Sequence, residues 1–424
     1  MELPRGIKGA PDWLPPEARG FDHVERVMLE TAARAGYERI RTPVFEPTEV
    51  FARGVGASTD VVQKEMYTFI DKGDRSLTLR PEGTAGVMRA ALEANLPKTG
   101  ALPAKWAYAG EFFRQERPQA GRQRQFNQVG IEALGTDDPL VDAEVVLLGW
   151  EVLHRLGLRD VVLRINNLGD RGDRAVYHER LNAYLDRFDL PADVEERRHL
   201  NPLRAFDSKA PGMAEIMAEA PVLPDYVSED AKAHYAQVVE LLEAEGVPLV
   251  HDPRLVRGLD YYTRTTFEYQ VSSLGAQNAV GGGGRYDGLA EDLGWPERFP
   301  GIGWALGVDR TLLALRTDGV ELPDAARVSV FVVAAGADLA THAFTIASEL
   351  RRAGVPADLA CDGRSLKAQF KAADRSGARR AVVVGARELA EGKVTIRDLA
   401  SGEQWQASRS QLLAALDGTE TFDG

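Results

Sequence analysis

The chain has 424 residues, of which 44% are hydrophobic and 27% are charged, the balance of a soluble globular protein long enough for two or three domains. Its single cysteine, Cys361, excludes intrachain disulfides and argues against a thiolate zinc site, and no apolar run reaches the ~18 residues that span a bilayer. The formal net charge of −13 argues against a protein that coats DNA or other nucleic acid indiscriminately, although it leaves room for a local basic surface.

The first sixteen residues carry prolines and charges where a signal peptide would need an apolar stretch. We therefore expect a cytoplasmic protein without a membrane partner. Apolar residues at helical spacing predict an amphipathic helix over residues 16–35, which Gly36 can end in a left-handed conformation. Residues 37–43 then predict a strand that stops at a proline.

The middle of the chain mixes strand and helix patterns. Residues 105–135 predict two strands around a polar loop, 115–125, and residues 137–156 predict a helix. Residues from about 170 to 250 are rich in charge and alanine at helical periodicity, which is typical of an inserted helical module. From residue 255 the pattern becomes β-like and rich in glycine, until a helix predicted over residues 306–316.

Residues 317–326 are the best candidate for a linker, because they contain a glycine and a proline between two periodic regions. Beyond them, strands and helices alternate, which predicts a small α/β domain with parallel pairings. The predicted strands are 328–335, 356–360, 381–384, 394–399 and 404–407, and the predicted helices are 337–353, 365–376 and 411–416. Residues 351–397 hold 11 Lys/Arg against 5 Asp/Glu, a surplus that fits either a solvated helix face or an RNA-facing one.

The predicted hairpin at 105–135 carries the most informative side chains. Because the strand period is two, Phe126, Gln128 and Glu132 share one face, whereas the residues between them form a largely apolar face. On the preceding segment, Phe112, Arg114 and Glu116 also share a face. An antiparallel sheet with one solvated face would explain the alternation alone. The combination of aromatic, amide and carboxylate groups with arginines suited to phosphate contacts favours a binding site.

These residues resemble motif 2 of class II aminoacyl-tRNA synthetases in the form found in the histidyl-tRNA synthetase family. Further segments resemble other motifs of that family, in the family's order and over nearly the whole chain. They are the amino-acid loop at 79–84, the histidine-specific signature at 257–262 and its companion at 283–289, motif 3 at 301–310, and motif 1, the dimer-forming element, ending at Pro43.

The resemblance implies an ATP site. Arg114 should hold the α-phosphate, whereas Arg122 and Arg310 should reach the outer phosphates. Glu116 should belong to the same site, and Phe126 should stack on adenine. The glycines at 301, 303 and 307 should let the backbone approach the ring, since no Cβ intrudes. ATP with its bound Mg²⁺ is therefore the expected cofactor, and no protein-bound zinc is expected.

The resemblance also implies a histidine site and a tRNA contact. Arg257 should supply the positive charge that other class II enzymes obtain from a second magnesium ion, and it should act with Arg114 in catalysis. Arg117 and Gln119 are the weakest assignments, as readers of the tRNA acceptor end. The residues expected around L-histidine are Glu82, Thr84 and Gln128 at the α-amino group, Glu132 with Tyr261 or Tyr262 at the imidazole, and Arg257.

The fold class expected from the resemblance is α+β. A class II catalytic domain, an antiparallel sheet with helices, should comprise residues 1–167 and 251–320. A helical insertion should occupy 168–250, and an α/β anticodon-binding domain should occupy 326–424. The expected activity is ATP-dependent formation of histidyl-adenylate and transfer of histidine to the 3′ end of tRNA(His) by a homodimer.

Two rival interpretations remain at this point. One is a non-catalytic regulatory paralogue of ATP phosphoribosyltransferase, which shares the catalytic fold but lacks the C-terminal domain and parts of the signature. Here that domain is expected, and Arg114, Arg257 and Arg310 are in place. The other is a class II synthetase for threonine or proline, against which residues 257–262 weigh. The class I signatures H-I-G-H and K-M-S-K-S do not occur.

Overall fold

The computed structural model describes residues 3–15, 17–56, 59–99, 101–208, 210–275, 277–322, 328–361 and 363–417. The chain divides into two compact units, which we call the larger unit (Met1–Leu322) and the smaller unit (Pro323–Gly424). Pro16, the first residue of the predicted N-terminal helix, and residues 323–326 of the predicted linker lie outside the described residues. Within the described residues, no helix is both long enough and apolar enough to cross a membrane.

The larger unit is built on one eight-stranded sheet. Its six central strands run antiparallel, whereas β1 joins β5 and β8 joins β7 in parallel at the two edges. In spatial order the strands are β1 (Glu38–Arg39), β5 (Ala104–Phe113), β6 (Gln125–Leu134), β11 (Gly301–Gly307), β10 (Ala279–Arg285), β9 (Thr263–Val271), β7 (Val161–Asn167) and β8 (Leu249–His251). The predicted antiparallel sheet with helices is confirmed.

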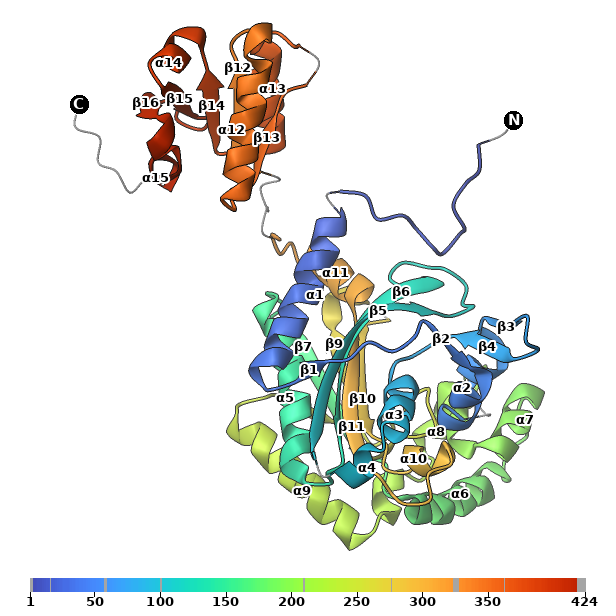
Figure 1. The fold of residues 1–424 in the computed structure, drawn as a ribbon. Helices are drawn as coiled ribbons and strands as arrows, with labels where there is room; N and C mark the ends of the chain where they lie inside the picture. The colour runs from blue at the N-terminus through green and yellow to red at the C-terminus, as the bar shows by residue number, and fades with distance from the viewer. Residues whose placement is uncertain are drawn as a thin grey trace. The chain divides into compact units, whose positions relative to one another are not determined.

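Helices cover both faces of this sheet, as Figure 1 shows. One face packs on α1 (Glu17–Arg34), α5 (Pro139–Arg155), α9 (Glu229–Ala244) and α11 (Val308–Thr317). The β6 side chains that point to this face, Val129, Ile131 and Ala133, are fully buried. The other face packs on α3 (Thr84–Glu93), α4 (Leu96–Thr99), α6 (Arg171–Leu185) and α10 (Leu289–Asp292). The predicted apolar face of residues 127–133 is therefore part of the core.

Short elements complete the larger unit. A three-stranded sheet pairs β2 (Phe45–Pro47), β4 (Ser76–Leu79) and β3 (Thr68–Ile70), next to α2 (Thr48–Gly54) and the π-helix η1 (Val61–Glu65). Between β7 and β8 lie α6, α7 (Ala192–Leu200), η2 (Pro202–Asp207), α8 (Met213–Ala218), η3 (Leu223–Tyr226) and α9, and η4 (Ser272–Leu274) follows β9. The helical character predicted for residues 170–250 is thus confirmed.

Two predicted elements differ from the structure. The strand predicted over residues 37–43 is only the two-residue β1, because the chain leaves the sheet before Pro43 and pairs again as β2. The helix predicted from residue 306 begins at Val308, since residues 301–307 form strand β11, which pairs with both β6 and β10. A central strand buried on both faces has no alternation of polar residues that would mark it as a strand.

The smaller unit contains a five-stranded sheet of order β13-β12-β14-β15-β16. Its strands are β12 (Val330–Ala334), β13 (Ala357–Leu359), β14 (Arg380–Val384), β15 (Lys393–Asp398) and β16 (Gln404–Ser408). Its helices are η5 (Ala337–Leu339), α12 (Ala340–Arg352), α13 (Leu366–Ser376), α14 (Ala386–Ala390), η6 (Arg409–Gln411) and α15 (Leu412–Asp417). The parallel pairings predicted from the alternation are confirmed for β12 with β13 and β14, and an antiparallel hairpin extends the sheet.

Candidate active site

A cavity of about 560 Å³ opens over β6, β10 and β11 in the larger unit. Segments far apart in sequence meet in its wall, because the sheet brings β6 beside β11 and β10. Eleven of the predicted site residues line it, namely Glu82, Thr84, Arg114, Glu116, Arg122, Phe126, Gln128, Arg257, Tyr261, Tyr262 and Arg310. Glu132, Arg117 and Gln119 are not among the lining residues.

Arg114 and Glu116 lie just past the end of β5, which stops at Phe113, so they are loop residues rather than strand residues. The backbone N–H of Arg114 nevertheless donates to the carbonyl of Arg124 at 2.9 Å, which continues the pairing with the β6 side for one more residue. The Arg114 side chain donates to the carbonyl of Pro81 (2.9 Å), and its guanidinium lies 5.4 Å from the centre of the Phe126 ring. An aromatic plate therefore lies beside a fixed cation.

Two more arginines enter the same wall. Arg310, in the first turn of α11, donates to the carbonyls of Ala279 (2.6 Å) and Gln277 and so ties the helix to the start of β10. Burial lowers the pKa of Arg310, and the neighbouring charge of Arg122 lowers it further. Like charges held close together in a partly buried wall favour an anionic ligand.

Arg257 lies against β10 at Gly282, where a Cβ would be 2.6 Å from its Nη1. That nitrogen donates to Oε2 of Glu268, on β9, at 2.8 Å, and the side chain of Gln270 holds the other oxygen of Glu268 at 2.7 Å. Burial alone would lower the pKa of Arg257, but the neighbouring Tyr262 and Glu268 raise it, so the guanidinium stays charged. Sequence reasoning did not identify Glu268, which also lines the cavity.

The opposite end of the cavity is rich in carboxylates and tyrosines. Glu82 accepts from the backbone N–H groups of Thr84 (2.7 Å) and Ala85 (3.0 Å), so it caps α3, and it also accepts from the Tyr261 hydroxyl at 3.3 Å. Its pKa is raised by burial. The helix-capping role and the place in the cavity wall thus coexist in one residue.

Glu132 lies one layer behind this wall. It is fully buried and accepts from the Thr84 hydroxyl at 2.8 Å and from the Tyr286 hydroxyl at 2.5 Å. Burial raises its pKa to about 8, and the two hydroxyl donors offset only part of that effect. Glu132 is therefore poised to share a proton with a basic group that reaches it.

Two of the three glycines of β11, Gly301 and Gly303, make room for the side chains around Glu132 rather than for the cavity. A Cβ at Gly303 would lie 1.9 Å from Oε2 of Glu132, and one at Gly301 would lie 2.3 Å from the Tyr286 ring. Of the three glycines expected to approach a ligand, only Gly307 lines the cavity. The expectation for Gly301 and Gly303 is therefore corrected, because they make room for protein side chains.

Sequence reasoning also missed Tyr108 and Tyr286. Tyr108 stands opposite Gly130 in the β5–β6 ladder, where a Cβ would meet the tyrosine ring and hydroxyl at 2.3 Å, and it lines the cavity. The period-two pattern extended back from Phe112 would have found it. Nearby, Oε1 of Gln128 is buried without a hydrogen-bond partner among the described residues. A polar ligand group would satisfy that oxygen.

Arg117 and Gln119 are exposed in the loop between β5 and β6. The amide of Gln119 contacts Gln277 at 3.2 Å, and its backbone pairs with that of Arg122. Neither residue lines the cavity.

This geometry combines an antiparallel sheet, an arginine-lined cavity with an aromatic plate, and a second, α/β unit, which together define the class II aminoacyl-tRNA synthetases. A family model described as Histidyl-tRNA synthetase matches residues 9–311, and one described as Anticodon binding domain matches residues 328–419. The chain belongs to the histidyl-tRNA synthetase family.

Individual relatives agree with this assignment. The chain is 52% identical over 411 residues to a Histidine–tRNA ligase from Nocardia farcinica, with 96% of each chain covered, and 53% identical over 397 residues to one from Mycolicibacterium vanbaalenii, with 94% of each covered. The apo histidyl-tRNA synthetase of S. aureus superposes with a TM-score of 0.82 at 36% identity, covering 98% of this chain and 99% of that one.

Proposed function

We propose that this protein activates L-histidine with ATP to form histidyl-adenylate and transfers the histidyl group to the 3′ end of tRNA(His). The observation that carries the proposal is the cavity that brings Arg114, Arg257 and Arg310 together with Glu82 and Tyr261. The regulatory-subunit alternative is not favoured, because a family model for the anticodon-binding domain matches residues 328–419 and the relatives at about half identity are named ligases.

The arginines serve the first half-reaction. The carboxylate of histidine attacks the α-phosphorus of ATP, and the bond to the leaving diphosphate breaks. Both reactants are anions, so the step needs fixed positive charge more than a general base. Arg114 and Arg257 supply that charge near the α-phosphate, Arg122 and Arg310 bind the outer phosphates, and Phe126 stacks on the adenine.

The carboxylate end of the cavity serves the amino acid. Glu82, Thr84 and Gln128 receive the α-amino group, and the unpaired Oε1 of Gln128 is a ready acceptor for it. Glu132 and the Tyr261–Tyr262 pair recognise the imidazole. Burial raises the pKa of Glu132 even though Thr84 and Tyr286 donate to it, so a basic ring that can share its proton is favoured over side chains without one.

Magnesium enters with ATP. Glu65 and Glu116 line the phosphate end of the cavity, and burial together with the Glu116 charge raises the pKa of Glu65, as expected where a divalent cation would relieve repulsion. Within the described residues, no group of three or more metal-ligating side chains converges. This fits Mg²⁺, which commonly uses one or two carboxylates and completes its shell with phosphate oxygens and water. Bound there, it would neutralise phosphate charge.

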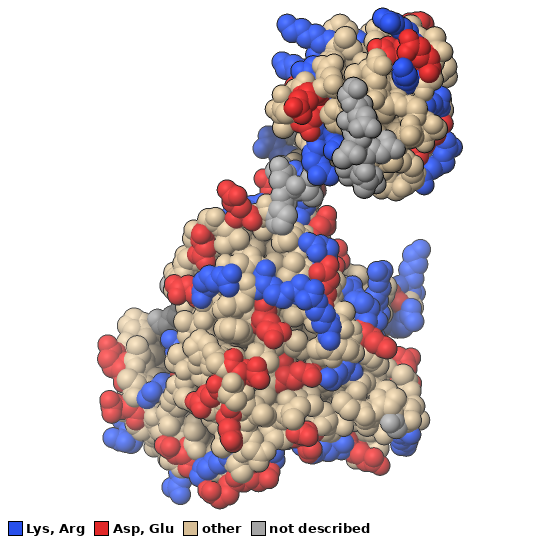
Figure 2. Space-filling model, turned by 90° about the vertical axis from the view of Figure 1, so that its left-hand side faces the viewer, with Lys and Arg blue, Asp and Glu red and all other residues tan. Residues whose placement is uncertain are grey.

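The tRNA is bound by both units of the chain. We assign residues 326–424 to the anticodon stem, 168–250 to an insertion, and 1–167 with 251–320 to catalysis, with Arg117 and Gln119 reaching the acceptor end. Acidic and basic side chains are interspersed on the face of the larger unit shown in Figure 2. On α13, by contrast, Lys367, Lys371 and Arg375 follow one another at helical spacing, all exposed and without an ion pair to a described residue. This row fits a phosphate backbone.

We further propose a homodimer formed through the motif 1 region and a cytoplasmic location, where tRNA is charged. The small sheet beside that region exposes the aromatic rings of Phe45 and Phe69, whose centroids are 6.2 Å apart, and Ile70. An exposed apolar cluster of this kind is typical of an interface. A monomeric mass by light scattering at micromolar concentration would contradict the dimer.

The experiment that tests the function is ATP–pyrophosphate exchange against all twenty amino acids, followed by charging of tRNA(His). Exchange that depends on histidine alone is expected. Exchange with threonine or proline, or none with any amino acid, would overturn the proposal. The former would indicate another class II specificity and the latter a regulatory protein.

A further inference from the structure

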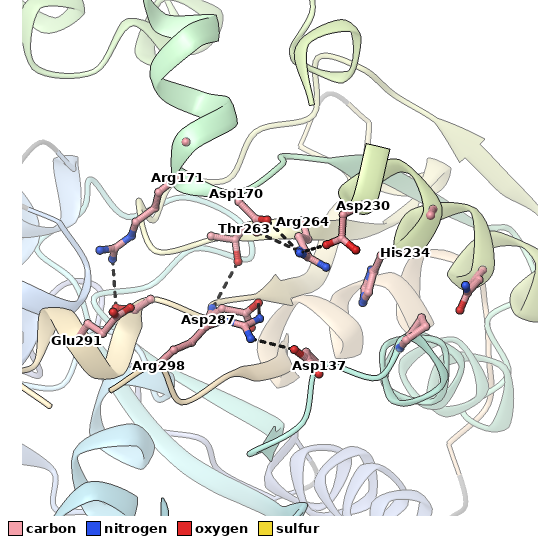
Figure 3. Close-up of a pocket in the computed structure, with 15 residues that line it drawn as sticks. Asp137, Asp170, Arg171, Asp230, His234, Thr263, Arg264, Asp287, Glu291 and Arg298 are labelled. Atoms are coloured by element: carbon pink, nitrogen blue, oxygen red, sulfur yellow. Dashed lines mark hydrogen bonds and ion pairs between the residues drawn. The ribbon is translucent and has the colours of Figure 1, made fainter. Parts of the chain in front are cut away.

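A second hollow, of about 730 Å³, lies where the helices between β7 and β8 meet the sheet, and Figure 3 shows its side chains. Its guanidinium groups already have carboxylate partners. Arg171 pairs with Asp292 at 2.5 Å, Arg298 with Asp137 at 2.8 Å, and Arg264 with Asp170 at 2.9 Å. Guanidinium groups that are already paired in this way connect secondary-structure elements and are not free to bind an anion. Of the three, Arg264 is the one on strand β9.

Arg264 is unusual in its backbone. It has a φ of +46°, a conformation that favours glycine, although it stands in the second position of β9. Its N–H donates to the carbonyl of Gly169 (2.9 Å), and its carbonyl accepts from the N–H of Leu168 (2.7 Å). The chain is thus pinned at the point where it leaves β7 for the inserted helices.

The Arg264 side chain also binds at the junction between β7 and the inserted helices. Its Nε and Nη2 donate to the two oxygens of Asp170, the N-cap residue of α6, at 2.9 and 3.0 Å, and Nη2 also reaches Asp230, in the first turn of α9, at 2.5 Å. Figure 3 shows the guanidinium between these two carboxylates. Burial would raise the pKa of Asp170, but Arg264 holds it below its usual range. One side chain therefore joins the first turns of two inserted helices to β9.

The residues just before Arg264 are Thr263 and the tyrosine pair of the proposed histidine pocket. Tyr261 and Tyr262 pack edge to face with ring centroids 4.6 Å apart, and the Tyr261 hydroxyl reaches Glu82. Thr263 is buried, and its hydroxyl accepts from the N–H of Asp287 at 3.4 Å. The tyrosines lie two and three residues before Arg264, so the backbone hydrogen bonds of Arg264 limit where their main chain enters β9.

We infer that Arg264 is a positioning residue for histidine recognition: it fixes the Tyr261–Tyr262 pair by tying its backbone to the first turns of α6 and α9. The inference rests on the proposed function, because it takes the tyrosines to contact histidine. It separates the two substrates in their Michaelis constants, since Arg114, Arg122 and Arg310 lie on other segments of the chain. Arg257, which precedes the tyrosine pair, is expected to act mainly on kcat.

The test uses Arg264→Gly in the full-length enzyme, because glycine tolerates the positive φ while the whole side chain, with its guanidinium, is removed. Arg171→Gln is the matched control, since it breaks the neighbouring ion pair from α6 to Asp292 without touching β9. Michaelis constants for histidine and ATP are measured by pyrophosphate exchange, with melting temperatures alongside. Arg264→Gly should raise KM for histidine about tenfold, within the range of coupling between contacting residues, and leave KM for ATP within twofold.

Arg264→Lys should recover part of the histidine affinity, and Asp170→Asn, which keeps a good N-cap, should weaken histidine binding by a smaller factor because Asp230 remains. If Arg264→Gly does not fold, Asp170→Asn decides. Equal increases in both Michaelis constants, or an effect no larger than that of Arg171→Gln, would overturn the inference. An unmodified enzyme without histidine-dependent exchange would instead overturn the proposed function.

Discussion

Replacing Arg257 by glutamine should slow histidyl-adenylate formation strongly. Arg257 lines the cavity, is held in place by Glu268 at 2.8 Å and lies against Gly282, so its charge needs little reorganisation to meet a phosphate. Two unit charges 4 Å apart interact by about 4 kcal/mol at an effective dielectric constant of 20. Removing one preorganised donor to a developing charge typically costs about 10²–10³-fold in rate.

Loss of Arg257 also leaves Glu268 without its positively charged partner beside the phosphates, although Gln270 still donates to it. We therefore expect a reduction of roughly 10²–10⁴-fold in kcat, equivalent to about 3–5 kcal/mol, with a smaller increase in KM. The double variant Arg257→Gln/Glu268→Gln should recover part of the loss, because the uncompensated carboxylate is gone. Lysine at position 257 should also rescue only in part, since a point charge does not reproduce the planar guanidinium.

Pre-steady-state kinetics of the two half-reactions provides the assay. Adenylate formation is followed after mixing enzyme, histidine and ATP, and transfer is followed after adding tRNA to preformed enzyme-bound adenylate. Transfer should be affected much less, because attack on the α-phosphate is already complete. Equal slowing of both steps would refute the reasoning and make Arg257 a residue that only supports the fold.

Other predictions concern the histidine pocket and the smaller unit. Glu132→Ala should lower kcat/KM for histidine by about 10²-fold or more and affect ATP little, because an imidazole N–H loses its buried acceptor; an unchanged KM and kcat would place Glu132 outside recognition. The pKa of Glu132 is raised to about 8 before histidine binds, and free imidazole has a pKa of about 6.5. Between these two pH values Glu132 carries a proton and the imidazole does not, so a complex in which they share one proton forms without proton uptake or release. Above pH 8 binding must take up a proton, so histidine affinity should fall about tenfold per unit, and Glu132→Gln should remove that alkaline decline. Replacing Lys367, Lys371 and Arg375 by glutamine should make the salt dependence of tRNA binding less steep by about 2–3 in log–log slope, with adenylate formation unchanged. The paired cations Arg387 and Lys393 provide the control, and an equal effect there would contradict a specific role for α13.

The sequence alone determined the features that are encoded locally. Period-two alternation located the β5–β6 hairpin and its buried face at Val129 and Ile131, and the alternation of apolar strands and helices defined the smaller unit. The cavity residues Arg114, Phe126 and Arg257 could be named because each stands within a short segment whose order of residue types is distinctive. Their convergence in one cavity follows from the family fold that those segments indicate.

Only the tertiary structure decided how distant segments meet. Nothing near Gly303 in sequence shows that its missing Cβ accommodates the carboxylate of Glu132, or that Tyr286 donates to that same carboxylate from 154 residues away. Likewise, the sequence around Arg264 is that of an ordinary strand, and only the fold shows that its guanidinium pairs with Asp170 and Asp230. Periodicity reports which face a side chain occupies, whereas these contacts depend on which strands are neighbours and in what register. The order of the strands and their register are set by pairing across the sheet, and the pattern of residues along one strand does not contain that information.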